Sequence, residues 1–220
     1  MAAEKKKRTY DAARTKEIIL NAAEELFAEH GYSAARIDAI AQKSGYNKSL
    51  IYQYFQDKLG LYTEVVKRAD QLGDSILREL IGDLLTDESV PSDPVKFRRL
   101  LEMLISIAYQ FMVEHPRYLK IYAWEAAEEF KTWNQIAYRP DDISEFYKLA
   151  KAAKENGIIR KDIDAFLLPI MMWNSVSSFI QSYSRLKDLM EEIGEPLPQE
   201  RAKEQIVKLV IYGVMEPSLL

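Results

Sequence analysis

The stretch of residues 36–61, RIDAIAQKSGYNKSLIYQYFQDKLGL, restricts the possible fold more than any other part of this chain. Ile37, Ile40 and Ala41 recur at helical spacing, which places them on one face of a short helix. Gly45 ends this helix, because a residue without Cβ adopts the left-handed conformation that closes a helix and lets the chain turn. The stretch therefore predicts two short helices that meet at a glycine turn.

The second short helix has one apolar face and one free face. Asn47 is a good N-cap for it, and Ile51 and Phe55 stand one turn apart and face inward. The side chains left to point outward are those of Lys48, Ser49, Tyr52 and Gln53. Such donors and an aromatic ring on a helix-turn-helix are the groups needed to read the DNA major groove.

Two positions beside this helix are suited to the DNA backbone. Asp57 can cap the next helix, and Lys58 just inside it is placed to meet a phosphate together with the backbone N–H groups. The guanidinium of Arg36 can hold a phosphate through two bonds. The predicted DNA-binding residues are Arg36, Tyr46, Asn47, Lys48, Ser49, Tyr52, Gln53 and Lys58.

Residues 19–61 resemble the DNA-binding domain of the TetR (tetracycline-repressor-like) transcriptional regulators. The residues at the family's spacing are Phe27, Gly31, Tyr32, Ile40, Ala41, Gly45, Tyr52, Phe55 and Lys58. Where the family usually has Thr at the start of the motif's first helix, this chain has Arg36. The resemblance implies a dimeric regulator, a repressor rather than an activator, that leaves its double-stranded DNA operator when a small molecule binds.

The composition favours an all-α fold. With 220 residues, 48% of them hydrophobic, the chain is large enough to bury the core of one large or two small domains. Eight Gly and eight Pro are few for an all-β protein, and the absence of cysteine excludes disulfides and thiolate metal sites. No signal peptide or apolar run of about 20 residues is visible, so we expect a cytoplasmic protein without a membrane span.

The charge is distributed unevenly along the chain. A net charge of −4 argues at first against nucleic-acid binding, which depends on neutralising phosphates. However, residues 1–60 carry 10 Lys and Arg against 8 Asp and Glu, whereas residues 61–220 carry 20 against 26. The basic run at residues 5–8 is either a disordered arm that follows the DNA or a solvated tail without function.

Hydrophobic periodicity predicts helices along the whole chain. A first helix over residues 11–30 supplies an apolar wall for the two short ones, so residues 1–56 form a three-helix DNA-binding domain. A long helix over 57–84 connects this bundle to the rest, and residues 86–94 form a loop. Further helices are expected over 94–114, 117–130, 142–156, 162–190 and 199–215. Residues 57–220 thus form a larger helical domain for ligand binding and dimerisation.

The last two helices are predicted to form a homodimer interface. The helix from Asp162 is hydrophobic almost all round in its first half, so it must be buried on more than one side. The last helix is amphipathic through Ile206, Leu209, Val210 and Val214. Pairing with their symmetry mates gives a four-helix arrangement, which the family resemblance also implies. The alternative is a monomer in which these faces are ordinary core.

Catalytic constellations are absent from the sequence, so no enzymatic activity and no cofactor are predicted. Two histidines, no cysteine and no Gly-rich phosphate loop leave most nucleophilic and metal-hydrolase schemes without their parts. The acidic residues Asp141, Asp142 and Glu145 could hold Mg²⁺ for a diphosphate substrate, but no second acidic cluster stands out. They are more simply helix caps favoured by the helix dipole.

The larger domain has more aromatic residues and Met than packing needs, which is typical of a cavity for an apolar or aromatic ligand. The predicted ligand-binding residues are Tyr109, Trp124, Met171, Asn174 and Ser178. Each of them can also be read as an ordinary core or interface residue. The resemblance implies that the ligand would tilt the helix over 57–84 and move the two reading helices out of register. A protein partner that docks without any ligand is the alternative for this domain.

Overall fold

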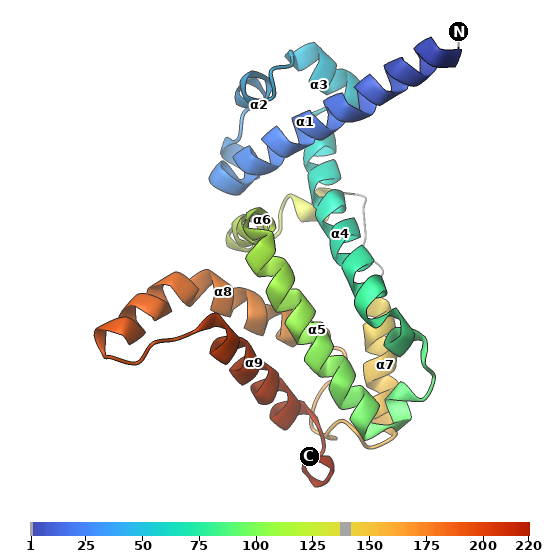
Figure 1. Cartoon of the computed structure of the whole chain (residues 1–220), viewed down its shortest axis with the longest axis vertical. Helices are drawn as coiled ribbons and strands as arrows, with labels where there is room; N and C mark the ends of the chain where they lie inside the picture. Colours follow the sequence, from blue (N-terminus) through green and yellow to red (C-terminus); the bar gives the residue numbers. More distant parts are fainter. Residues whose placement is uncertain (1, 137–141) are drawn as a thin grey trace. The chain divides into compact units, whose positions relative to one another are not determined.

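The computed structural model describes residues 2–136 and 142–220, with side chains for residues 12–136 and 145–220. The described part is all-α, as predicted, and its only β pairing is an isolated bridge between Ile159 and Met215. The helices are α1 Ala2–Ala34, α2 Ile37–Ser44, α3 Lys48–Phe55, α4 Lys58–Thr86, α5 Pro94–Glu114, α6 Pro116–Ala127, α7 Asp142–Glu155, α8 Leu168–Glu192 and α9 Gln199–Val214, with short 3₁₀ helices η1 Val90–Ser92, η2 Trp133–Gln135 and η3 Pro217–Leu219 (Figure 1). In this described part, no helix combines the length and the apolar character that crossing a membrane requires.

The contacts divide the chain into two compact units. The first consists of Met1–Gln71 and His115–Arg139, and the second of Leu72–Glu114 and Pro140–Leu220. The first unit is therefore larger than the predicted domain of residues 1–56, because it includes the first half of α4 and all of α6. The assignment of DNA binding to residues 1–56 and of ligand binding to residues 57–220 stays a prediction.

The core of the first unit is built on one face of α1. The wall predicted for this helix is present, and the side chains that meet it from α2, α3 and α4 are fully or almost fully buried. The main members are Ile19, Ala23, Leu26, Phe27, Ile37, Ile40, Ile51, Phe55, Leu61 and Val65. The helix itself begins at Ala2, so the backbone of residues 5–8, for which the sequence left a disordered arm or a solvated tail open, belongs to α1.

A kink at Gly31 separates the last turn of α1 from the rest of the helix. Gly31 has φ 72° and ψ 172°, a conformation that is essentially restricted to glycine. The indole of Trp124 on α6 lies 3.0 Å from where a Cβ of Gly31 would be, and its Nε1–H donates to the Ala28 carbonyl over 3.2 Å. Gly31 therefore breaks the helix, as predicted, and also admits α6 to the surface of α1.

A buried carboxylate ties α6 to α4 within the first unit. Glu125 is only 2% exposed, and its Oε1 accepts a 2.7 Å hydrogen bond from the Tyr62 hydroxyl. Its Oε2 accepts from the Trp133 backbone N–H over 3.1 Å. Burial and then the bond to Glu125 raise the pKa of Tyr62 far above its usual value, so the hydroxyl remains a donor. This arrangement satisfies a group that would otherwise be costly to bury.

Helix α6 ends earlier than predicted, at Ala127 instead of residue 130. Glu129 and Phe130 both have positive φ, and the Phe130 N–H donates to the Glu125 carbonyl over 2.7 Å. This turn brings Phe130 and Trp133 against Tyr122, with ring centroids 5.6 and 5.8 Å from that of Tyr122. Aromatic packing over the C-terminus of α6 thus replaces a further helical turn.

In the second unit α5 packs against both α8 and α9, and α7 packs against α8 and η1. Helix α8 begins at Leu168, so the predicted start at Asp162 was wrong. Pro169 has no N–H and is tolerated only in the first turn of a helix, which excludes six preceding helical residues. Instead, Asp162 pairs with Arg160, and the Asp164 carboxylate accepts from the Phe166 N–H over 2.8 Å.

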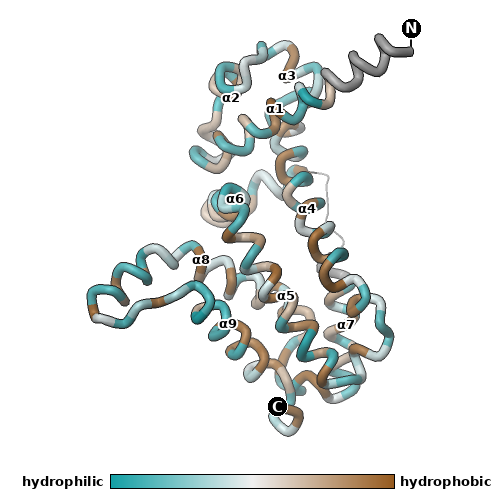
Figure 2. Tube along the Cα trace, in the orientation of Figure 1, coloured by the Kyte–Doolittle hydropathy of each residue, from teal (hydrophilic) through white to brown (hydrophobic). Residues whose placement is uncertain are grey.

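The last two helices change character along their length. Helix α8 is apolar near its start and hydrophilic toward Glu192, whereas α9 changes from hydrophilic to apolar toward its C-terminal end (Figure 2). Many of their large apolar side chains are exposed in the single chain. They are Ile170, Met171, Trp173, Leu189, Leu209 and Tyr212, with Phe166 and Leu167 just before α8.

Gly31→Ala should lower the free energy of unfolding by about 1–3 kcal/mol, because Ala is strained at this φ and ψ and its Cβ would press on Trp124. Gly82→Ala is the matched control: Gly82 lies inside α4 with nothing within 4 Å of the added Cβ. The control should stabilise by about 0.5–1 kcal/mol. Urea unfolding followed by circular dichroism measures both, and equal effects of the two changes would contradict the kink.

Tyr62→Phe should lower the free energy of unfolding by about 1.5–3 kcal/mol, because it leaves the Glu125 carboxylate buried with one donor fewer. Tyr54→Phe, which removes a hydroxyl from a half-buried ring of the same unit, on α3, serves as the comparison. The same urea titration applies. A loss no greater than that of Tyr54→Phe would show that the hydrogen bond to Glu125 does not stabilise this unit.

Candidate nucleic-acid interface

The turn between α2 and α3 has the predicted construction. Gly45 is left-handed at φ 76°, and its N–H donates to the Ala41 carbonyl over 3.0 Å. Asn47 caps α3, since its Oδ1 accepts a 2.9 Å hydrogen bond from the Leu50 N–H. Arg36 stands at the N-cap of α2 without capping it through its side chain. The guanidinium is therefore not used for the fold at this position.

Helix α3 buries one face and exposes the other. Ile51 is 0% and Phe55 5% exposed, both in the core that α1 organises. On the opposite face Tyr52 is 44% exposed. The other predicted contact residues on or next to α3 are exposed as well, with Tyr46 half-buried: Asn47, Lys48, Ser49 and Gln53. The free face predicted from the sequence is therefore a free surface of the first unit.

A tight turn fixes the end of α3 against the start of α4. Gln56 has φ 68° and ψ −60°, and the Asp57 N–H donates to the Phe55 carbonyl over 2.8 Å, which is the geometry of a γ-turn. Such a conformation costs about 1–3 kcal/mol and persists only where the surroundings enforce it. Asp57 caps α4 as predicted, because its Oδ1 accepts from the Gly60 N–H over 2.7 Å.

Most cations beside α3 are bound by the chain itself. Lys48 forms an ion pair with Asp38 of α2. Lys58 donates from Nζ to the Ser33 carbonyl over 3.2 Å and lies 4.5 Å from the centre of the Tyr32 ring. Burial lowers the pKa of Lys58. Lys58 is thus half-buried and bonded within the chain, and the phosphate contact expected from the sequence stays a prediction.

Sequence reasoning missed the contribution of α1 to this surface. The Thr15 hydroxyl donates to the Tyr46 hydroxyl over 3.4 Å, and Lys16 Nζ lies 5.4 Å from the centre of the Tyr54 ring. Both residues are separated from their partners by more than thirty positions, so periodicity could not reveal the contacts. They add a hydroxyl and an ammonium group next to the free face of α3.

The predicted ligand residues are divided between the two units. Tyr109 is buried in α5, and its hydroxyl donates to the Gln199 carbonyl over 3.4 Å. Trp124 belongs to the first unit, on α6. Met171 is 61% exposed on α8, and Asn174 and Ser178 are exposed on the same helix. The sequence predicts Met171, Asn174 and Ser178 inside the domain, whereas all three are exposed on α8.

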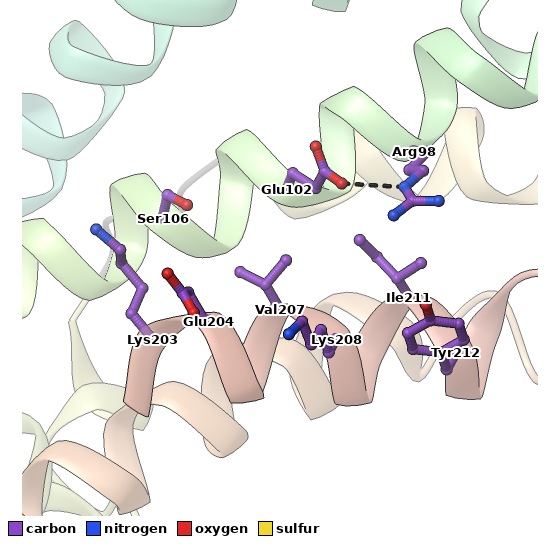
Figure 3. A pocket seen from close by; sticks show the side chains of 9 residues that line it. All are labelled: Arg98, Glu102, Ser106, Lys203, Glu204, Val207, Lys208, Ile211 and Tyr212. Carbon is purple, nitrogen blue, oxygen red and sulfur yellow. Dashed lines mark hydrogen bonds and ion pairs between the residues drawn. The ribbon is translucent and has the colours of Figure 1, made fainter. Parts of the chain in front are cut away.

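A shallow cavity of 280 Å³ lies between α5 and α9 in the second unit, and Figure 3 shows its lining. Val207, Ile211 and Tyr212 of α9 face Arg98 and Glu102 of α5, which are joined by a 3.0 Å hydrogen bond. None of the five predicted ligand residues lines it.

The acidic cluster of the enzyme alternative is only partly described. Asp141 and the side chain of Asp142 lie outside the described residues, and Glu145 is paired with Lys148 over 2.6 Å. Over the described ranges, 2–136 and 142–220, no three His, Asp or Glu side chains gather as a metal site would require.

Comparison with known proteins agrees with this geometry. Residues 19–65 match the family of bacterial regulatory proteins described as the tetR family. The chain is 34% identical over 118 residues to the HTH-type transcriptional repressor SCO4008 of Streptomyces coelicolor, which covers 54% of this chain and 53% of the relative. It is 26% identical to the repressor NicS of Pseudomonas putida over 71% of each protein.

A solved structure shares the fold over nearly the whole chain. The ketosteroid transcriptional regulator KstR2 of Mycobacterium tuberculosis superposes with a TM-score of 0.63 at 20% sequence identity, covering 91% of this chain and 95% of that one. The alignment with SCO4008, by contrast, spans about half the length of that relative. These relatives are named as regulators and not as enzymes, in agreement with the sequence. Residues 19–65 of this chain are thus similar to the tetR family of bacterial regulatory proteins.

Proposed function

We propose that the protein is a DNA-binding transcriptional repressor that reads its operator with the free face of α3. The observation that carries this proposal is the two-sided character of α3: Ile51 and Phe55 are buried, while Lys48, Ser49 and Tyr52 are exposed. A capped helix on a packed core loses little conformational freedom when it enters the major groove. The relatives named as repressors support the same direction of regulation.

The exposed side chains divide into two roles. Lys48 and Gln53 have donors that suit base edges, such as guanine O6 and N7 or the N6/N7 pair of adenine. The guanidinium group of Arg36 and the hydroxyl groups of Tyr46 and Tyr52 can bind phosphates and so position α3 on the duplex. Thr15 and Lys16 of α1, next to Tyr46 and Tyr54, extend this backbone surface. A repressor that binds its operator in this way would act in the cytoplasm.

The protein would act as a homodimer through α8 and α9. The exposed apolar side chains of these helices include Met171, which is 61% exposed, and Leu209, which is 71% exposed. So many exposed large apolar side chains on two helices are unusual on a monomer and typical of an interface. A two-fold pairing of the same face on two copies gives an isologous contact and presents two reading helices to two half-sites.

A small, largely apolar or aromatic effector is proposed to release the operator. The aromatic and Met content of the second unit and the similarity to the tetR family support this proposal. No residues are assigned as contacts of the effector. An effector can move the equilibrium only by binding the DNA-free arrangement more tightly than the DNA-bound one. A protein partner that binds the same unit is the alternative occupant.

Arg36→Ala should weaken operator binding and reduce the slope of log K against log salt by about 0.9 for each phosphate that the variant no longer neutralises. Lys48→Ala should weaken binding of the operator by about 1–3 kcal/mol if it contacts a base. Arg78→Ala removes a guanidinium that is 75% exposed on α4 and serves as the control. Fluorescence anisotropy at several salt concentrations measures all three. An Arg36→Ala slope equal to that of the control would remove Arg36 from the DNA surface.

Leu209→Lys should convert the dimer into monomers, because burying the lysine charge in an apolar interface costs desolvation free energy. On a monomer the same charge stays in water and carries no such cost. Leu80→Lys is the matched control, since Leu80 is 54% exposed on α4, outside α8 and α9. Sedimentation equilibrium distinguishes the two masses. Dimers of both variants would place the interface elsewhere.

A further inference from the structure

The first residue of α3 is held by an acid of the preceding helix. Lys48 Nζ forms an ion pair with Asp38 Oδ1, although the side chains are 49% and 67% exposed. Asp38 lies in the first turn of α2, two residues after Arg36. The hydrogen bond to Asp38 raises the pKa of Lys48, so the ammonium form is the one that is bound. The ion pair therefore engages the ammonium group of the first residue of the proposed reading helix.

Two further cations of the helix-turn-helix, Lys43 and Lys58, are also bound by the chain itself. Lys43 pairs with Glu25 over 2.5 Å, and Lys58 donates to the Ser33 carbonyl. Of the four basic residues in the span from Arg36 to Lys58, whose side chains are all described, only Arg36 makes no side-chain ion pair or hydrogen bond there. The chain thus offers less free positive charge to a duplex than its sequence suggests.

On DNA without the operator, where Lys48 has no matching base edge, a phosphate and the Asp38 carboxylate compete for the same ammonium group. Non-specific binding to a duplex depends almost entirely on neutralised phosphates. An ammonium that stays with Asp38 releases no counterion from DNA, and the carboxylate itself repels the backbone. Exposed ion pairs of this kind shift an equilibrium by a factor of about 1.5 to 5. The competition is therefore large enough to measure and small enough for an operator to overcome.

We propose that Asp38 competes with DNA phosphates for Lys48 and so keeps the affinity for non-operator DNA low. The inference rests on the proposed function, since it concerns the same surface. It adds an acidic residue of α2 as a determinant of selectivity, although the residue itself contacts no DNA. A repressor whose phosphate contacts are restrained in this way is held at its operator by base contacts to a larger extent.

Asp38→Asn tests the competition on a short duplex of random sequence, by fluorescence anisotropy over a series of KCl concentrations. The variant should bind about 1.5 to 5 times more tightly per half-site, with a salt slope steeper by about 0.9. Asp74→Asn is the matched control, because it also frees an exposed cation from an ion pair, Arg78 on α4. The control should leave both quantities unchanged.

The same change in a Lys48→Ala background separates competition for Lys48 from a general effect of charge. If Asp38 acts through Lys48, Asp38→Asn gains less than half as much affinity once Lys48 is absent. An equal gain in both backgrounds, or no gain in either, would overturn the inference. If the wild-type protein binds the duplex and Asp38→Asn leaves the affinity unchanged, this inference alone is wrong. If the protein binds no duplex at low salt, the proposed function is wrong as well. Thermal melting should be the same for all variants, since the pair is exposed.

Discussion

The packing of α3 against α1 is the interaction on which the proposed function depends. Ile51 and Phe55 are buried in the α1 core, and each such side chain contributes about 1.5–3 kcal/mol by its burial. Because these residues stand one turn apart, their burial decides which side of α3 remains free. The Asn47 cap and the γ-turn at Gln56 then fix both ends of the helix. A short helix that would be unstable alone becomes a rigid reading element.

Helix α6 strengthens the same unit from a distant part of the sequence. Trp124 packs at the Gly31 kink, and Glu125 accepts hydrogen bonds from Tyr62 and from the Trp133 backbone. A buried carboxylate with two donors is specific in direction, whereas apolar contacts alone would allow α6 to slide. The unit that positions α3 therefore includes a segment more than fifty residues beyond the helix-turn-helix.

The parts of the helix-turn-helix that depend on local chemistry could be predicted from the sequence. The left-handed Gly45, the Asn47 cap and the Asp57 cap each involve residues within four positions of one another, and all three are present. Contacts between distant residues left no such pattern, as with Tyr62 and Glu125. The predicted start of α8 is wrong because an apolar run does not fix where a helix begins, whereas Pro169 restricts the start to the residues just before it. The predicted ligand residues follow from composition, which does not distinguish a buried side chain from an exposed one such as Met171.

Chemical protection of DNA tests most directly whether α3 enters the major groove. Dimethyl sulfate methylates guanine N7, which lies in the major groove, and adenine N3, which lies in the minor groove. On a fragment from around its own gene, the protein should protect guanine N7 at two places about 10 bp apart or a multiple of that spacing. Adenine N3 should stay reactive at those places. Protection confined to adenine N3, or spread evenly over all guanines, would contradict the assignment of α3 as the reading helix.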